Sequence, residues 1–316
     1  MNQTERNLYI GQNFVRQLIQ KNVAPEDVIH IHKQVLFELY PDLPKTMEHS
    51  FDFLIEIMIH FGLTLKEHQS LLEIQEELIM EMNVAAKIQS LILKTTVPTS
   101  EQVDVGMVSI PVRKMNGDYV HFINDENNYI SVGVTDVVGK GVPAALCMSM
   151  VKYGLDTLEY AENNPSYVLS VLNRIIEKSV DDSMFVSMFY GRYDFEQGIF
   201  TYGSAGHEPA IYYNEEENTF SELDTKGLLL GVLPEVKYFQ NYVELKTGDL
   251  VVMMTDGVTE VRKENDVDTQ EVIKDFLLKH KHLGAQEICD KLYQYLLKRQ
   301  EFELQDDFTV VILKKK

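Results

Sequence analysis

The sequence predicts an α+β protein with a helical N-terminal part and a C-terminal domain of mainly antiparallel sheets. Residues 2–95 contain only five glycines and prolines, and their apolar positions recur at helical spacing. After Ser100, short β-branched runs alternate with glycine-containing and acidic turns. The predicted helices of this second part come in pairs rather than in regular alternation with strands. That arrangement is typical of separate layers of helices and antiparallel sheets.

The N-terminal part is expected to form an all-helical bundle over residues 1–82. Pro25 marks the start of one helix, with acidic residues beside the positive end of its dipole. Pro44 opens a third helix, which is expected to end at Gly62. Thr64 and Glu67 stand three residues apart, as in a capping box, and predict the start of a fourth helix. Nothing in this part indicates catalysis.

A heptad pattern predicts that the last of these helices continues as a coiled-coil linker over residues 83–100. Two apolar series repeat every seven residues, with one acidic interruption at Glu81; they comprise Leu71, Leu78, Ala85 and Ile92, and Ile74 and Ile88. A short parallel coiled coil predicts a homodimer. An amphipathic helix lying on its own domain is the alternative interpretation of so short a pattern. The boundary with the C-terminal domain, residues 101–316, is placed at the breaking sequence V-P-T-S of residues 97–100.

Alternating apolar patterns and turn residues predict nine strands and four helices in the C-terminal domain. The strands are expected at residues 103–112, 119–123, 129–135, 184–194, 198–204, 209–213, 238–245, 250–255 and 308–313. The helices are expected at residues 142–160, 165–180, 269–281 and 284–299. Asn164 is predicted to cap the second helix, with Pro165 at its first position.

The composition limits the classes of partner. With 29 basic and 49 acidic residues, the chain carries a formal net charge of −20, which repels phosphate backbones and anionic lipids. Nucleic acid and direct membrane binding are therefore not expected. No stretch approaches the roughly 18 uncharged apolar residues of a membrane-spanning helix, and the first residues lack the features of a signal peptide. The two cysteines, Cys147 and Cys289, are expected to be buried and unpaired, so we expect a cytoplasmic protein.

Four aspartates at the ends of predicted strands indicate a metal site. They are Asp118, Asp136, Asp256 and Asp306. Each could be an ordinary turn or cap residue when taken alone. Four carboxylates that converge without clustered lysine or arginine are best compensated by hard divalent cations, which prefer oxygen ligands. A pair of such ions about 3.5 to 4 Å apart can promote in-line displacement at phosphorus. The pattern therefore predicts metal-assisted phosphoester hydrolysis.

Short motifs in a fixed order extend this prediction to the whole C-terminal domain. They are G-D-Y at 117–119, D-V-V-G-K-G-V-P-A-A at 136–145, S-M-F-Y-G at 187–191, S-A-G-H-E-P at 204–209, L-G-V-L-P at 230–234, T-G-D-L at 247–250, T-D-G-V-T-E-V-R at 255–262 and D-D-F-T at 306–309. Together they resemble the PPM family of metal-dependent serine/threonine phosphatases, in its SpoIIE-like branch. The resemblance implies an αββα sandwich and two Mn²⁺ or Mg²⁺ ions.

The resemblance also implies roles for individual residues. Asp136 would be the catalytic-centre carboxylate that bridges both ions, and the backbone carbonyl of Val137 would bind one of them. Asp118, Asp256 and Asp306 would be the remaining metal ligands. The arginine that contacts phosphate in the eukaryotic branch has no obvious counterpart before Asp118.

His207, in S-A-G-H-E-P, has two possible roles. It could donate a proton to the serine leaving group as a general acid, or it could hold a turn at the end of a strand. We favour the structural role, because this setting is common to the SpoIIE-like branch.

The helical part resembles the N-terminal regions of phosphatases in the sigma-B stress pathway. The similar segments are H-I-H-K-Q-V-L-F-E-L-Y-P-D-L-P at 30–44 and F-D-F-L-I-E-I-M-I-H-F-G at 51–62. This resemblance implies a phosphorylated RsbV-like anti-anti-sigma factor as substrate and an RsbT-like activator that binds the N-terminal domain. The chain would then be a positive regulator of the general stress response. Two alternatives are a catalytically silent regulatory scaffold with the same fold and an enzyme acting on small phosphoesters.

Overall fold

The computed structural model describes residues 5–21, 23–125, 128–139, 141–158, 164–180, 184–259, 269–299 and 304–316. The chain separates into two units, Met1–Glu81 and Met82–Lys316. The first unit is helical, and the second contains all the described strands. No helix in the described ranges is both long and apolar enough to cross a membrane.

The first unit contains α1 (Glu5–Gln20), α2 (Pro25–Leu39) and most of α3 (Lys45–Ile92). Pro25 begins α2 as predicted, with Glu26 and Asp27 in the first turn. Helices α2 and α3 are joined by an ion pair between Lys33 Nζ and Asp52 Oδ1, 2.6 Å apart. No residue of α2 is fully buried. The unit therefore leaves much of its apolar surface in contact with solvent.

The predicted break between a third and a fourth helix is wrong, because α3 is one helix of 48 residues. Thr64 does not act as a cap: its Oγ1 donates to the carbonyl of His60, one turn earlier, at 3.0 Å. Gly62 lies inside the helix, where a glycine costs only about 1 kcal/mol relative to alanine. Local capping and breaking signals are thus outweighed by the favourable residues on both sides.

The second unit contains two five-stranded antiparallel sheets. In order, the first sheet is β1 (Val103–Ile110), β10 (Phe308–Lys315), β9 (Leu250–Met254), β6 (Ala210–Asn214) and β7 (Thr219–Leu223). The second is β2 (Asp118–Asp125), β3 (Tyr129–Val138), β4 (Phe185–Asp194), β5 (Ile199–Ala205) and β8 (Asn241–Glu244). The predicted antiparallel architecture is confirmed.

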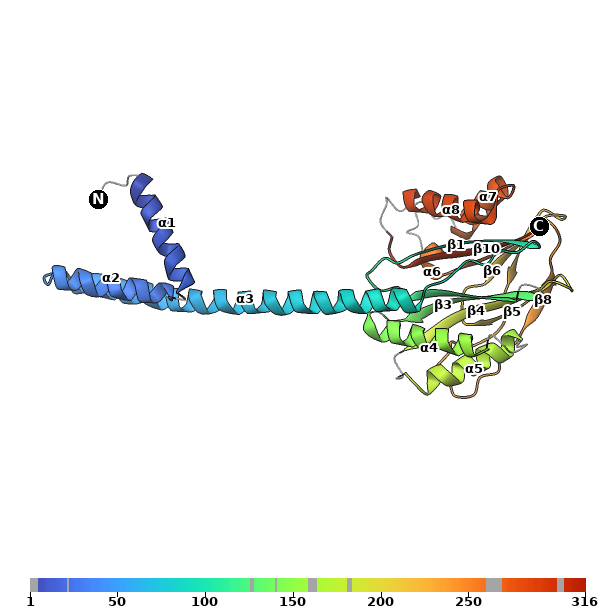
Figure 1. Cartoon of the computed structure of the whole chain (residues 1–316), viewed down its shortest axis with the longest axis horizontal. Coiled ribbons are helices and arrows are strands. Elements are labelled where there is room, and N and C mark those ends of the chain that lie inside the picture. The colour runs from blue at the N-terminus through green and yellow to red at the C-terminus, as the bar shows by residue number, and fades with distance from the viewer. Residues whose placement is uncertain are drawn as a thin grey trace. The chain divides into compact units, whose positions relative to one another are not determined.

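Helices cover the outer face of each sheet, so the unit has four layers (Figure 1). Helices α4 (Val142–Leu158) and α5 (Pro165–Glu177) pack on the β2–β8 sheet, and α7 (Thr269–His280) and α8 (Ala285–Arg299) pack on the β1–β7 sheet. The Asn164 side chain accepts from the backbone N–H of Tyr167 and caps α5 as predicted. The helix predicted over residues 142–160 is described to Leu158, and residues 159–163 lie outside the described part.

Three apolar layers hold the sandwich together. One fills the space between the sheets, with Val134 and Phe189 from one side and Val311 from the other. The other two lie between each sheet and its helix pair, and Cys147 and Cys289 belong to them as free, buried residues. Successive residues of a strand point to opposite faces of the sheet. The central strands β3 and β10 are covered on both faces, so nearly all of their side chains are buried.

Strand β7, Thr219–Leu223, was not predicted. It follows the acidic segment N-E-E-E-N and lies at the edge of its sheet, with most of its side chains exposed. An exposed edge strand forms through its ladder to a neighbour, here β6, rather than through an apolar pattern of its own. The one-turn helix α6, Asp256–Thr259, was also not predicted.

Candidate active site

The four predicted acids lie at one end of the sandwich. Asp118 on β2 and Asp136 on β3 are direct cross-strand partners. Asp256 begins α6 immediately after β9, and Asp306 lies two residues before β10, the neighbour of β9. Three of the four acids, Asp136, Asp256 and Asp306, line one cavity of about 390 Å³. Asp118 does not line it.

Asp118 is buried beside this cavity, next to Gly117 and opposite Asp136 in the strand ladder. Its side chain is almost fully buried, with 3% exposed, and its Oδ2 accepts from Thr255 Oγ1 at 2.7 Å. Burial raises the pKa of Asp118 well above its usual value, while hydrogen bonds from Thr309 and Thr255 act in the opposite direction. Asp136 contributes to the increase through its negative charge. Asp118 therefore connects the two sheets beside the site through its hydrogen bonds to Thr255 and Thr309.

Asp136 is the carboxylate most affected by its neighbours. Burial raises its pKa to about 7, and the negative charges of Asp256, Asp306 and Asp307 add to the increase. A carboxyl group whose pKa is raised by both burial and like charges is destabilised in its charged form. A cation placed among these oxygens would remove that penalty. The charge of the site therefore fits a bound divalent ion.

Gly117 leaves an opening lined by oxygen atoms. A Cβ atom built on this glycine would lie 3.3 Å from Asp307 Oδ2, 3.7 Å from Asp136 Oδ1 and 3.9 Å from the carbonyl oxygen of Val137. Three oxygens thus border a space that any side chain at Gly117 would fill. Hard divalent cations prefer such oxygen ligands, including backbone carbonyls. We call these atoms and the Gly117 backbone the oxygen cradle.

The cradle is not a closed set of side-chain ligands. Across the described ranges, no group of three histidine, cysteine, aspartate or glutamate side chains is arranged to hold a metal by itself. One of the cradle atoms is a backbone carbonyl, and the negative charges of Asp256, Asp306 and Asp307 oppose ionisation of Asp136. An ion placed between them would draw the carboxylates together. The donor set therefore fits a metal that completes the site when it binds.

Asp307 is a site residue whose function was not predicted. Its Oδ1 accepts from the backbone N–H of Val112 at 2.7 Å, and its Oδ2 accepts from the N–H of Gly117 at 2.6 Å. It thereby fixes both ends of the segment that connects β1 to the cradle. Asp306 stays the predicted metal ligand of this adjacent pair, and the two backbone hydrogen bonds give Asp307 a separate role that the sequence did not indicate.

The segment that precedes Asp118 also carries two basic residues, to which no role was assigned from the sequence. Arg113 and Lys114 both line the cavity, and both are exposed. The other charged residues of the cavity lining are all aspartates. A guanidinium and an ammonium in this position can bind the oxygens of a phosphate group. In the sequence, the two residues are distinguished only by their position between β1 and Asp118. That position became informative once the structure showed that this connecting segment lines the cavity.

His207 has both ring nitrogens engaged in the interior. Its Nδ1 lies 2.8 Å from Ser187 Oγ, and its Nε2 lies 3.1 Å from the carbonyl oxygen of Met254. Because a carbonyl can only accept, Nε2 carries the proton and Nδ1 accepts from the serine hydroxyl. Burial lowers the pKa of His207 to about 4. The histidine is therefore neutral at pH 7, and it holds the end of β9 from which Asp256 projects.

Substituting His207→Gln is expected to reduce the melting temperature but to change kcat less than tenfold. Glutamine can still donate to Met254 and accept from Ser187, although in a different geometry. General acid catalysis contributes about 10² to 10⁴ in rate, so a loss of that size would identify His207 as the proton donor. The measurement is kcat over pH 5.5–9 together with thermal unfolding. Disappearance of one limb of the pH profile would also contradict the structural role.

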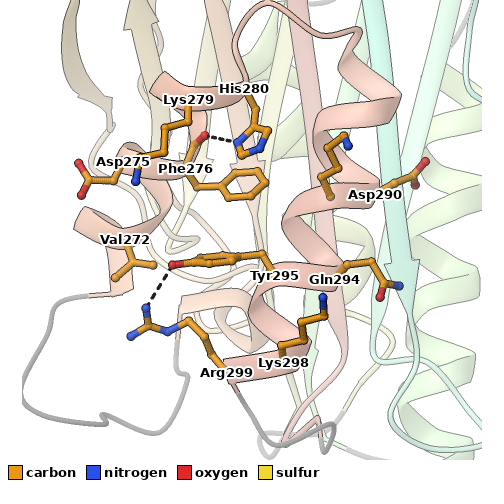
Figure 2. A pocket seen from close by; sticks show the side chains of 11 residues that line it. Val272, Asp275, Phe276, Lys279, His280, Asp290, Gln294, Tyr295, Lys298 and Arg299 are labelled. Carbon is orange, nitrogen blue, oxygen red and sulfur yellow. Dashed lines mark hydrogen bonds between the residues drawn. The ribbon is translucent and has the colours of Figure 1, made fainter.

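A larger cavity lies between α7 and α8, and its lining includes none of the four predicted metal-binding aspartates. It has a volume of about 590 Å³, and Figure 2 shows Phe276 and Tyr295 stacked across it, with ring centroids 5.1 Å apart. The two acids in its lining, Asp275 and Asp290, stand among lysines and an arginine. None of the predicted metal ligands belongs to it. Charge and ligand chemistry, rather than size, therefore identify the smaller cavity as the candidate active site.

Two families of known proteins match this chain. Residues 126–316 match the family described as stage II sporulation protein E (SpoIIE). Residues 1–64 match the family described as the N-terminal domain of phosphoserine phosphatase RsbU. Among individual proteins, the chain is 46% identical over 313 residues to phosphoserine phosphatase RsbU of Bacillus subtilis (strain 168), covering 99% of this chain and 93% of that protein.

Solved structures share the fold of the second unit. The SiaA-PP2C domain of Pseudomonas aeruginosa superposes with a TM-score of 0.64 at 19% identity, over 77% of this chain and 98% of that chain. The catalytic domain of the serine threonine protein phosphatase PstP, solved in complex with 2 manganese ions, superposes with a TM-score of 0.51 at 15% identity, over 67% of this chain and 98% of that chain. At these identities the likeness concerns the fold alone.

Proposed function

Since the chain belongs to the RsbU family of phosphoserine phosphatases, with a SpoIIE-type phosphatase domain, we propose that it dephosphorylates a phosphorylated RsbV-like anti-anti-sigma factor in the cytoplasm. The observation that carries this proposal is the acidic cavity around Asp136. Burial and three neighbouring acids raise the pKa of this carboxyl to about 7, and its Oδ1 borders the oxygen cradle. A site of this charge and donor set is suited to divalent metal ions and, through them, to a phosphate group.

Five residues are proposed to hold the metal ions. Asp136 would bridge two Mn²⁺ or Mg²⁺ ions, the carbonyl of Val137 would bind one of them, and Asp118, Asp256 and Asp306 would complete the ligands. When bound, such ions activate water and stabilise the charge that develops during in-line attack at phosphorus. The PstP structure shows that the same fold can hold two manganese ions in another protein. Asp118 is buried and does not line the cavity, so it would be the least accessible of these ligands.

The remaining groups of the site act on the substrate and on the backbone. Arg113 and Lys114 can hold the phosphate oxygens and offset their negative charge beside the aspartates of the cavity lining. Asp307 keeps the Gly117 peptide in place, which leaves the oxygen cradle open. His207, neutral and buried, holds the backbone before Asp256. The proton for the serine leaving group would then come from water in the open cavity.

The helical unit is proposed to bind an RsbT-like activator and to support a homodimer. Its match to the RsbU N-terminal family supports the first part. The heptad residues Leu71, Ile74 and Leu78 are 59%, 51% and 55% exposed, and a second copy of the helix could cover this stripe. Glu81 within the seam would keep such a coiled coil weak. An activator could then shift it by preferring one of two states.

We expect phosphate release from a phosphorylated RsbV-like protein in the presence of Mn²⁺, with an increase on addition of an RsbT-like protein. The comparison uses the full chain and a chain lacking residues 1–81, the first of the two units. Stimulation confined to the full chain would support both substrate and activator assignments. Equal stimulation of both chains would overturn the role of the helical unit. Folded protein that releases no phosphate in any condition would favour the regulatory scaffold.

A further inference from the structure

One buried polar side chain joins the end of α3 to the phosphatase domain. Gln89 is the one buried residue among the 48 residues of this helix, with 5% of its surface exposed. Its Nε2 donates to the carbonyl of Asn116 at 2.8 Å, and the backbone N–H of Asn116 donates to its Oε1 at 3.1 Å. The side-chain amide thus pairs with both backbone groups of a single residue. We call this pair of hydrogen bonds the Gln89 clamp.

The clamp acts on the residue next to the oxygen cradle. Asn116 immediately precedes Gly117, whose N–H donates to Asp307 and whose carbonyl accepts from the N–H of Val137 at 3.2 Å. The Asn116 side chain in turn accepts from the N–H of Asp118 at 2.9 Å. The Asn116 amide also donates to Ser109 Oγ on β1 at 3.3 Å. Gln89 therefore holds one side of a short segment whose other hydrogen bonds reach β1, Asp307 and two proposed metal-site residues, Asp118 and Val137.

The rest of the contact between the helix end and the sheet is loosely packed. A cavity of about 280 Å³ lies there, bordered by Ala86, Ser90 and Leu93 on the helix side and by Ser109 and Asp118 on the other. After the helix, Thr95 Oγ1 donates to the carbonyl of Val120 at 2.6 Å. With open space beside it, the helix is held mainly by specific hydrogen bonds. Successive residues of a helix point about 100° apart, so a small rotation of α3 would remove Gln89 from Asn116.

We propose that Gln89 is a positioning residue: it holds the Asn116 backbone, and through it makes metal binding depend on the rotation of α3 about its own axis. With the clamp formed, the Asn116–Gly117 backbone is held where the oxygen cradle is open. When the end of α3 rotates or unwinds, the clamp breaks, and the Asn116–Gly117 backbone keeps its bonds to Asp307 and Val137 but loses its support from α3. This inference rests on the proposed function and deepens it, because it assigns the route by which a partner bound to the helices alters the site.

The route differs from one through the helix that follows Asp136. Helix α4 contacts the site through Ala144, but it is integrated into the apolar layer below the β2–β8 sheet. Moving it would disturb a packed core. Breaking two hydrogen bonds beside an open cavity disturbs much less, so the clamp is the contact that can change without loss of the fold.

The test compares Gln89→Met with Gln286→Met in the full-length chain. Gln286 on α8 makes the same type of pair: the N–H of Met107 donates to its Oε1 and its Nε2 donates to the carbonyl of Met107, both at 3.0 Å. Each substitution removes two hydrogen bonds to one backbone residue, but only Gln89 is bonded to the residue beside the cradle. Mn²⁺ binding is measured directly by titration calorimetry, and thermal unfolding is followed in EDTA.

Gln89→Met is expected to raise the Kd for Mn²⁺ by about tenfold, because residues that orient metal ligands typically change affinity 10- to 100-fold. Gln286→Met is expected to leave this Kd unchanged and, because Gln286 is exposed, to lower the melting temperature in EDTA by less than Gln89→Met does. Gln89→Glu retains the acceptor for Asn116 N–H and should give an intermediate Kd. It also provides the measurement if Gln89→Met does not fold.

The role of the clamp in metal binding would be contradicted by equal Kd values in the two methionine variants. It would also be contradicted if both Gln89 variants had the Kd of the wild type. Phosphate release from the phosphorylated protein is measured on the same samples. Wild-type protein that binds Mn²⁺ but releases no phosphate would contradict the proposed function, while the difference in Kd would still decide the role of Gln89.

Discussion

Asp136→Asn is expected to reduce phosphate release by at least about a hundredfold without unfolding the protein. Substitutions of residues that only orient metal ligands already cost 10- to 100-fold, so loss of the bridging carboxylate should reach or exceed the upper end of that range. Asparagine has nearly the same shape as aspartate. It removes one charge from a group in which Asp256, Asp306 and Asp307 oppose ionisation of Asp136. The metal-free variant should therefore be at least as stable as the wild type at pH 8.

Asp136→Asn is thus expected to lower phosphate release but not the stability of the metal-free protein, and both quantities can be measured on the same samples. Phosphate release is followed with Mn²⁺, and melting temperatures are recorded with EDTA and with Mn²⁺. We expect the Mn²⁺-induced increase in melting temperature to disappear in the variant. Asp224→Asn, at an exposed position outside the cavity, is the matched control and should behave like the wild type. Full activity in Asp136→Asn would remove this residue from the metal site.

Removal of divalent ions is expected to abolish turnover and to leave a protein whose stability falls as the pH rises. The pKa of Asp136 is raised from 3.8 to about 7 in the folded chain, and the pKa of Asp118 is raised as well. Between pH 4 and 7 the folded state therefore retains protons that the unfolded state releases. Since stability decreases with pH wherever the folded state binds more protons, the metal-free chain loses stability across this range. Bound Mn²⁺ would replace those protons.

The stabilisation by Mn²⁺ should consequently be larger at pH 8 than at pH 5.5. At a concentration of 100 times Kd, an ion adds about 2.7 kcal/mol, which corresponds to about 5 to 10 °C for a domain of this size. His121 and His207, with pKa values lowered to about 4, act oppositely, because their contribution to stability is lost as the pH falls below 6.5. Asp136→Asn lacks the carboxylate effect but keeps both histidines. Comparing its melting temperature with that of the wild type at each pH therefore separates the carboxylate effect from the histidine effect. An Mn²⁺ effect that is equal at both pH values would contradict the carboxylate assignment.

The sequence was informative wherever local pattern and tertiary position coincide. Asp136 and Asp256 follow apolar runs that can only be central strands, so their place at the end of a sheet was predictable. Asn164 before Pro165 predicted a helix start that the structure confirms. The assignment of the metal ligands themselves stays a prediction, which the structure supports by bringing Asp136, Asp256 and Asp306 to one cavity.

The sequence was less informative wherever a contact between distant segments decides the outcome. Gln89 resembles any polar residue of an amphipathic helix, and only the pairing with Asn116 distinguishes it. Asp118 looked equivalent to the other acids, but it is buried, bonded to Thr255 of the other sheet, and absent from the cavity lining. Gly62 predicted a helix end that the flanking residues override. In each case the missing information is the position of a partner, which propensity and spacing do not contain.

The placement of β10 has a consequence for the order in which the molecule assembles. This strand lies between β1 and β9, and its register joins Val103 to Lys315, residues at opposite ends of the second unit. Pairings between such distant segments have a high entropic cost of loop closure and form late in folding. Asp306 and Asp307 immediately precede β10, so the acidic cavity exists only after this late step. A ligand of the cavity would therefore prolong the lifetime of the folded state without accelerating its formation.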